Sequence, residues 1–182
     1  MRFAALLVFA ALWSVVVYAP VAHWVWEGGG WLNQLGALDF AGGAVVHVNA
    51  GVAALVCATM LGRRRGYGTE AFEPHSLGWT AIGTALLLFG WFGFNAGSAL
   101  SADGRAALAF VVTLVAAAAG GLAWMLMEWV VRGAPTLLGL LSGLIGGLVA
   151  ITPAAGVVQV GSAALMGLIA GVVCFWGATW LK

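Results

Sequence analysis

The sequence predicts an all-α membrane protein, a polytopic bundle of about six transmembrane helices, from three observations. Of its 182 residues, 63% are hydrophobic and only 7% are charged, whereas soluble domains carry roughly 25% charged residues. The apolar residues form long uninterrupted runs, which favour helices over the short alternating segments of a β-barrel. The ten tryptophans are typical of a chain with many side chains at membrane–water interfaces.

Six apolar runs account for most of the chain, and most can cross about 30 Å of hydrocarbon at about 1.5 Å per residue. They are 3–26, 39–62, 77–100, 106–131, 136–151 and 161–181. The fifth run is short and needs its flanks to span a membrane. Pro20 lies inside the first run and predicts a kink there. The connections are short, so we expect a single domain over residues 1–182.

Basic residues indicate the orientation in the membrane. An even number of helices places both chain ends on one side, and positive charge marks the cytoplasmic side. The basic residues on that side are Arg2, Arg63, Arg64, Arg65, Arg132 and Lys182, and only Arg105 opposes them. Both ends are therefore expected in the cytoplasm. The first run also resembles a signal peptide, but its single leading arginine and its length favour a retained helix.

Small residues recur at spacing four in the last two runs, which predicts closely packed helices. The two ridges are Gly139, Gly143 and Gly147, and Ala163, Gly167 and Gly171. Glu128 and Arg132 lie four residues apart near the end of the fourth run and predict an ion pair.

Composition also argues against several functions. The net charge of +1 gives no nucleic-acid footprint. Cys57 and Cys174 lie inside apolar runs and predict neither a disulfide framework nor a zinc site. The sequence contains no phosphate-binding loop and no nucleophile–base arrangement. We therefore expect transport and not catalysis, with no cofactor and no metal.

His47 and Asp39 are the polar residues of the second run. A histidine at membrane depth is a candidate functional residue, although a hydrogen bond to a neighbouring helix would also explain it. Gly43 and Gly51 share the His47 face at helical spacing. Asp39 would cap the helix, attract a cation to an outer vestibule, or do both. At about 12 Å along a helix axis, Asp39 and His47 are too far apart for a catalytic pair.

Trp91, Phe94 and Ser98 form one stripe on the third run. Such stripes usually mean ordinary helix packing. The alternative is an aromatic-walled conduit with a hydroxyl at its mouth, because aromatic faces attract cations within about 6 Å of the ring centroid. Trp26, at the outer end of the first run, would act in the same way or serve as an interfacial anchor.

Two long motifs in the chain are specific. They are Asp-Phe-Ala-Gly-Gly-Ala-Val-Val-His at 39–47 and Gly-Trp-Phe-Gly-Phe-Asn-Ala-Gly-Ser at 90–98. Shorter matches are Gly66-Tyr67-Gly68, Pro74-His75, and the segment 137–156 with its Ile151-Thr152-Pro153-Ala154. Together these residues resemble the ammonium transporter family (Amt/Mep/Rh), on its Amt branch, over essentially the whole chain.

The resemblance implies a fold of about eleven helices with an inverted five-helix repeat, assembled as a homotrimer in which each protomer has its own pore. This chain is similar to the fourth to ninth helices of that fold. The implied function is ammonium transport across the cell membrane. NH4+ is captured and deprotonated, and ammonia and the proton pass separately. Neutral ammonia avoids the desolvation cost that a bare cation meets in an apolar pore.

The same resemblance assigns roles at the outer entrance. Trp26 and Ser98 would help form the outer ammonium site, and Asp39 would be the acidic residue below it. Methylammonium would serve as a substrate analogue.

In the pore, Phe94 would be one of two stacked gate phenylalanines, Trp91 would line the wall, and His47 would be one of two pore histidines. The second histidine and the other gate phenylalanine belong to helices outside this chain, which is either a piece of a longer protein or a truncated product. A pore walled on one side would expose polar groups to lipid. We therefore expect no competent pore from this chain alone.

Two other functions compete with transport. One is a non-transporting membrane scaffold or ammonium-sensing partner that binds full-length subunits. The other is a small-gas channel of the Rh type, which the Amt-like motifs make the weaker alternative.

Overall fold

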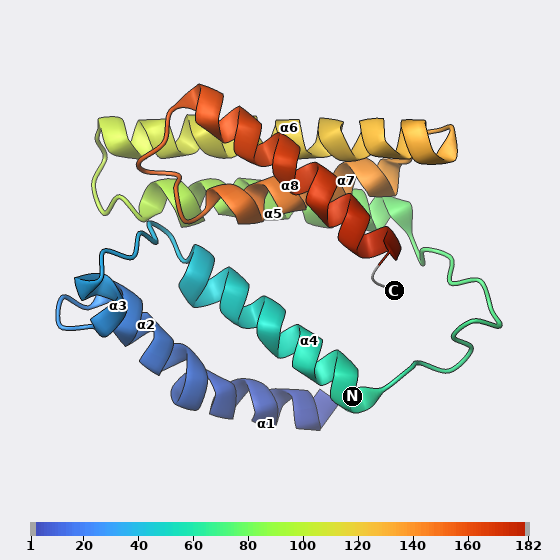
Figure 1. Ribbon diagram of the computed structural model, residues 1–182, viewed down its shortest axis with the longest axis horizontal. Coiled ribbons are helices and arrows are strands. Elements are labelled where there is room, and N and C mark those ends of the chain that lie inside the picture. The colour runs from blue at the N-terminus through green and yellow to red at the C-terminus, as the bar shows by residue number, and fades with distance from the viewer. Residues whose placement is uncertain (1–2, 181–182) are drawn as a thin grey trace. The chain divides into compact units, whose positions relative to one another are not determined.

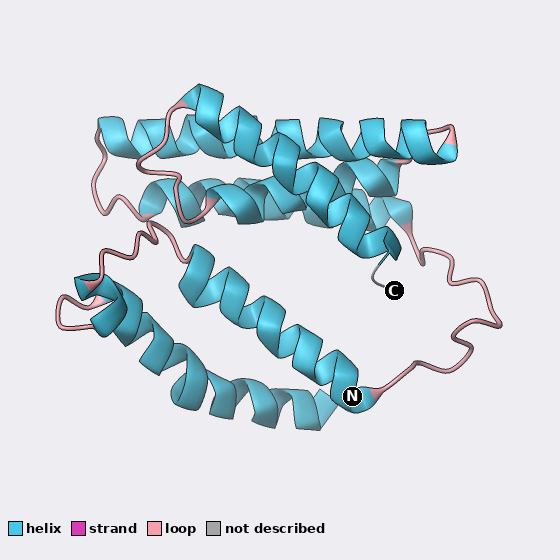
Figure 2. Cartoon of the chain, viewed as in Figure 1, coloured by secondary structure: helices cyan, strands magenta, loops and turns pink. Residues whose placement is uncertain are grey.

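The computed structural model describes residues 3–180, and the chain divides into two compact units, Met1–Glu73 and Pro74–Lys182. Figure 1 traces the chain from one end to the other. Figure 2 shows helices joined by loops, with no strand among residues 3–180. The predicted all-α class is therefore confirmed.

Five helical stretches within residues 3–180 are long and apolar enough to cross a membrane. They are Phe3–Gln34, Gly43–Leu61, Leu77–Gly97, Gly104–Arg132 and Val160–Trp180. The shorter apolar helix Leu137–Ile151 corresponds to the fifth predicted run. The chain is thus a multi-pass membrane protein. Arg2, Leu181 and Lys182, used in the predicted orientation and last run, lie outside the described residues.

The first unit consists of two long helical stretches with a short helix between them. Its elements, in which η denotes a π-helix, are α1 (Phe3–Trp13), η1 (Ser14–Tyr18), α2 (Ala19–Trp26), α3 (Trp31–Gln34), η2 (Gly43–Val48) and α4 (Asn49–Leu61). The sequence predicted that the second stretch would begin at Asp39, but it begins at Gly43. Gly42 has a φ of 106°, a left-handed conformation that glycine adopts without strain, so the chain turns here before the helix starts.

Pro20 lies at the start of α2, directly after the π-helical turns of η1. Proline has no N–H, and its ring crowds the carbonyl four residues earlier, which here is Val16. The wider π-helical turns accommodate this defect without ending the helix. Figure 1 shows the ribbon changing direction between α1 and α2, as the predicted kink requires.

Within residues 74–180 the second unit contains four helices, three of which begin at a capping side chain. They are α5 (Leu77–Gly97), α6 (Gly104–Arg132), α7 (Leu137–Ile151) and α8 (Val160–Trp180). Ser76 caps α5, and Thr136 caps α7 by accepting the Gly139 N–H at 2.9 Å. Asp103 caps α6 from an exposed loop, accepting the N–H of the second residue of the helix at 2.9 Å. The hydrogen bond from the Ser101 hydroxyl lowers the pKa of Asp103 below its ordinary value.

The helices α6, α7 and α8 pack with their backbones in near contact. A Cβ on Gly120 of α6 would lie 3.0 Å from Gly147 Cα of α7, and a Cβ on Gly167 of α8 would lie 2.9 Å from Ala116 Cα of α6. The carbonyl oxygen of Ala116 is the nearest atom to the Cβ position of both Gly147 and Gly167. The small-residue ridges therefore form the tight bundle that their spacing predicted.

Glu128 joins the ends of α6 and α7. The residue is 2% exposed, and its side chain accepts the Thr136 N–H at 2.7 Å and the Thr136 hydroxyl at 2.9 Å. Arg132 lies 3.2 Å away, which confirms the predicted ion pair, and also donates to Thr179 of α8 at 3.3 Å. The Trp124 indole donates to the same carboxylate at 3.3 Å. Glu128 thus holds the ends of α6 and α7 together, and Arg132 extends the network to α8.

We expect Glu128→Ala to lower the free energy of unfolding of the chain by about 2 kcal/mol, because it removes the shared acceptor of the Thr136 N–H, the Trp124 indole and Arg132. Glu128→Gln keeps an acceptor oxygen for Thr136 and should cost about 1 kcal/mol. Unfolding in detergent micelles, followed by circular dichroism, measures both changes. Equal stability of the alanine variant and the wild type would show that Glu128 does not hold the helix ends.

Candidate functional site

The Asp39 carboxylate organises the start of η2. One oxygen accepts the N–H groups of Gly42 (3.0 Å) and Gly43 (2.5 Å), and the other accepts those of Ala44 (2.9 Å) and Val45 (3.0 Å). Asp39 is buried, with 8% of its surface exposed. These four bonds satisfy the donors that a helix start leaves unpaired and place a negative charge at the positive end of its dipole. The capping interpretation of Asp39 is confirmed.

Trp26 is fixed against the same turn. Its indole N–H donates to the Asp39 carbonyl oxygen at 2.8 Å, and a Cβ on Gly42 would lie 3.4 Å from Trp26 Cζ2 and 2.7 Å from the Val46 side chain. Trp26 remains 43% exposed. One ring is therefore held in position by its polar edge while much of its surface stays accessible.

His47 lies within η2, and its N–H bonds the carbonyl of Gly42 at 3.1 Å in the i to i−5 pattern. The side chain is half-buried. Because the backbone is π-helical from Gly43 to Val48, the α-helical spacing used to place Gly43 beside His47 does not hold here. Isolated π-helical turns occur frequently at functional sites. A Cβ on Gly51 would meet no atom within 4 Å.

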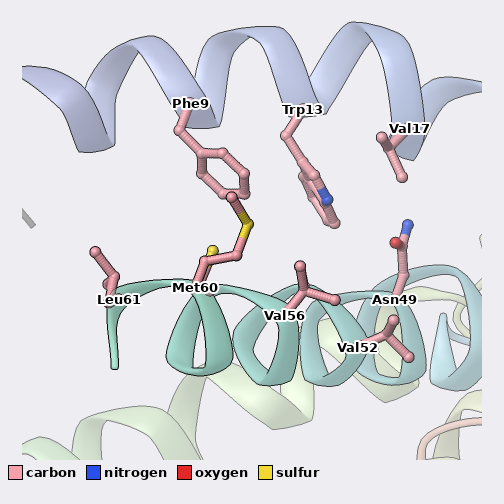
Figure 3. A pocket seen from close by; sticks show the side chains of 10 residues that line it. Phe9, Trp13, Val17, Asn49, Val52, Val56, Met60 and Leu61 are labelled. Carbon is pink, nitrogen blue, oxygen red and sulfur yellow. The ribbon is translucent and has the colours of Figure 1, made fainter. Parts of the chain in front are cut away.

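An apolar pocket of about 490 Å³ lies between α1 and α4 in the first unit (Figure 3). Its lining residues are Phe9, Trp13, Val17, Asn49, Val52, Ala53, Val56, Cys57, Met60 and Leu61. Asn49 is its one amide, and its Nδ2 donates to the Val45 carbonyl at 3.3 Å. None of the predicted site residues lines this pocket.

In the second unit, Trp91, Phe94 and Ser98 follow one another along α5. The ring centroids of Trp91 and Phe94 are 5.9 Å apart with an interplanar angle of 56°, and Phe94 is 39% exposed. The Ser98 hydroxyl donates to the Phe94 carbonyl at 2.7 Å. Its oxygen therefore keeps lone-pair capacity for another donor. The predicted stripe is present.

Two hydrogen bonds tie α5 to its neighbours, and the sequence analysis predicted neither. The Trp91 indole donates to the Thr152 hydroxyl at the end of α7, at 3.0 Å. Asn95 Nδ2 donates to the Thr113 hydroxyl of α6 at 2.9 Å. Asn95, Thr113 and Thr152 are all 0% exposed. The available signal was a polar side chain in an apolar run. Threonine is a weak signal of a contact between helices, because its hydroxyl readily hydrogen-bonds a carbonyl of its own helix.

The structure thus brings the predicted site residues together in two sets. In the first unit, Trp26 ends α2 and is bonded to the turn of Asp39, which leads into η2 with His47. The aromatic stripe with Ser98 belongs to α5 of the second unit. Among residues 3–180, no group of three or more His, Cys, Asp or Glu side chains could hold a metal ion. The first set offers an aromatic face and an imidazole, and the second offers two aromatic rings and a hydroxyl. Each set by itself suits a small cation or its neutral base better than an anion.

The chain matches the model of the Ammonium Transporter Family over residues 1–182. It is 59% identical over 182 residues to an ammonium transporter of Bacillus subtilis, covering 100% of this chain and 44% of that protein. The chain therefore spans less than half the length of this relative.

Two solved structures are similar to the chain in their fold. Mep2 of Candida albicans superposes with a TM-score of 0.91 and 44% identity, covering 97% of this chain and 40% of that one. A structure described as a sensor Amt protein gives a TM-score of 0.91 at 31% identity, covering 100% of this chain and 48% of that one.

Proposed function

Because the chain belongs to the ammonium transporter family, we propose that its helices form part of a pore that carries ammonium across the cell membrane. The observation that carries the proposal is the Asp39 turn. The carboxylate commits both oxygens to four backbone N–H groups, so it places negative charge near the entrance without acting as a free proton acceptor. A cation is attracted there but is not trapped.

The first unit would supply an aromatic face to the substrate. The Trp26 indole N–H is occupied by the Asp39 carbonyl, so the π-face and not the polar edge is available to a cation. In the second unit, the Ser98 oxygen would accept an N–H of NH4+, because its own proton is already donated to Phe94.

The pore itself would admit ammonia and not the bare cation. Phe94 and Trp91 offer no acceptors strong enough to replace water around a charge, so NH4+ would have to lose its proton before passing them. The His47 imidazole would then hydrogen-bond ammonia or accept the proton, since an imidazole nitrogen can act as donor or acceptor. The roles of all six residues, Trp26, Asp39, His47, Trp91, Phe94 and Ser98, are part of the proposal.

The proposal extends to the setting of the complete protein. It would lie in the plasma or inner membrane with both ends of this segment in the cytoplasm, assemble as a homotrimer within the bilayer, and accept methylammonium as an analogue. Residues 1–182 would form part of one transmembrane domain. No catalytic reaction is assigned.

The proposal is tested by the growth, at low external ammonium, of cells that lack their own ammonium transporters. We expect a chimaera, in which this chain replaces the 182 aligned residues of the Bacillus subtilis transporter, to restore growth, and the chain alone not to restore it. If the chimaera is present in the membrane but the cells do not grow, the proposed role in transport is contradicted. Growth with the chain alone would show that these helices need no others.

Ammonium sensing is a second candidate, favoured by the similarity to the sensor Amt structure. A sensing segment would bind ammonium without moving it. An ammonium-dependent change in tryptophan fluorescence of the purified chimaera, together with failure to restore growth, would support sensing over transport.

A further inference from the structure

The rotation of α5 decides which way its aromatic stripe faces, and residues outside the stripe fix that rotation. Thr152 is the most informative of them. It ends α7, is followed by Pro153, and has no exposed surface. A threonine at such a place has no contact with solvent and is not one of the six residues assigned to the substrate.

The Thr152 hydroxyl is both a donor and an acceptor. It donates to the Leu148 carbonyl of its own helix at 2.8 Å and accepts the Trp91 indole N–H at 3.0 Å. The bond to Leu148 orients the hydroxyl proton away from the indole, so an oxygen lone pair faces the Trp91 N–H. Buried hydrogen bonds in series of this kind are strengthened by their low-dielectric surroundings.

We propose that Thr152 is a positioning residue that sets the Trp91 ring and, through it, the Phe94 ring. The inference rests on the proposed function only where it concerns substrate discrimination. Phe94 contacts Trp91 at a centroid distance of 5.9 Å, and Phe94 is partly exposed whereas Thr152 is buried. A side chain at a functional site stays in place when a buried neighbour holds it by directional bonds. Thr152 therefore acts on the stripe without touching the substrate.

The chain offers a matched control for a purely structural effect. Thr113 also has no exposed surface and accepts a hydrogen bond from α5, from Asn95 at 2.9 Å, while donating to Ala109 at 2.6 Å. Asn95 is not part of the stripe. Thr113→Val removes a comparable buried bond between α5 and a neighbouring helix but leaves the Trp91 bond in place.

The first test observes the Trp91 indole directly in the whole chain, reconstituted in lipid nanodiscs and labelled with ¹⁵N-tryptophan. The Trp91 signal is identified by its loss in Trp91→Phe. Thr152→Val should shift this signal and speed its hydrogen exchange, whereas Thr152→Ser, which keeps the hydroxyl, and Thr113→Val should leave it near its wild-type position. An unmoved signal in Thr152→Val, or an equal shift in Thr113→Val, overturns the proposal.

The second test measures discrimination between ammonium and methylammonium in the Bacillus subtilis chimaera. Loss of folded protein changes the amount of uptake but not this ratio. We expect Thr152→Val to change the ratio by about threefold or more, since one methyl group in a fitted apolar site is worth at least that much, and Thr152→Ser to restore it. An unchanged ratio beside a shifted indole signal overturns the positioning role. An inactive unsubstituted chimaera contradicts the proposed function, while the indole test still decides the Thr152–Trp91 link.

Discussion

Gly120→Ala should lower the free energy of unfolding of the chain by about 2–3 kcal/mol, although it adds only one methyl group. The new Cβ would lie 3.0 Å from both Gly147 N and Gly147 Cα, and closer still to the Gly143 carbonyl oxygen. These are backbone atoms, which cannot rotate away as a flexible side chain can. The helices α6 and α7 must therefore separate, and their packing contacts weaken along the whole interface.

Gly83→Ala is the matched control for this prediction. Gly83 lies within α5, and a Cβ there would meet nothing within 4 Å. Because alanine favours helices over glycine, this variant should be as stable as the wild type or more stable by up to about 1 kcal/mol. Unfolding of both variants in mixed detergent micelles, followed by circular dichroism, makes the comparison. Equal stability of the two variants would show that the close approach at Gly120 is not required.

Asp39→Ala is the second substitution with a large expected effect, about 3 kcal/mol or more in the free energy of unfolding. Four backbone N–H groups lose their acceptor, and an unsatisfied buried donor costs about 1–3 kcal/mol before relaxation. The Trp26 indole is bonded to the main-chain carbonyl of residue 39. This carbonyl remains in the variant, but loss of the cap loosens the turn that positions it, so the ring should become less firmly held. Asp39→Asn retains one acceptor oxygen and turns an NH2 group toward two donors, so it should lose most of the stabilisation as well.

Hydrogen–deuterium exchange of the amides at 42–45 measures the loss of the cap directly, and exchange should be much faster in Asp39→Ala. Asp103→Ala is the control, because Asp103 caps α6 through two first-turn N–H groups but is exposed. Water can replace its carboxylate there, so the expected cost is about 1 kcal/mol or less. Similar losses from both substitutions would mean that Asp39 is an ordinary cap.

Hydrophobicity alone predicted most of the fold. The first run, 3–26, matches the continuous helix from Phe3 to Trp26, and the fifth run ends with α7 at Ile151. Runs of apolar residues are decisive because a membrane helix must satisfy its backbone internally over a fixed thickness. The small-residue ridges predicted tight packing for a similar reason, since only glycine and alanine allow backbones to approach so closely.

The start of the second helix could not be predicted in the same way. Asp39 was expected to open it, but the left-handed φ of Gly42 delays the helix to Gly43, and a π-helix follows. Hydrophobic periodicity does not record a φ angle or a change from α to π hydrogen bonding. The capping role of Asp39 was nonetheless predictable, because a carboxylate near a helix start has few better partners than free N–H groups.

The hydrogen bonds that join α5 to α6 and α7 could not be predicted from the sequence either. Trp91 and Thr152 are 61 residues apart in sequence. Neither apolar run indicates which of the other helices it packs against. The site residues on one helix, Trp91, Phe94 and Ser98, could be grouped by their spacing. Partners on another helix depend on tertiary packing, which one sequence without relatives does not reveal.

The most direct test of the central claim is the initial rate of labelled methylammonium uptake by the Bacillus subtilis chimaera in cells without other ammonium transporters. Empty membranes give the background, and His47→Ala is compared at equal amounts of protein in the membrane. We expect uptake above background that unlabelled ammonium competes away and that His47→Ala alters. A chimaera that is present in the membrane but takes up no methylammonium, or whose uptake ammonium does not reduce, would contradict the assignment of these helices to an ammonium pore.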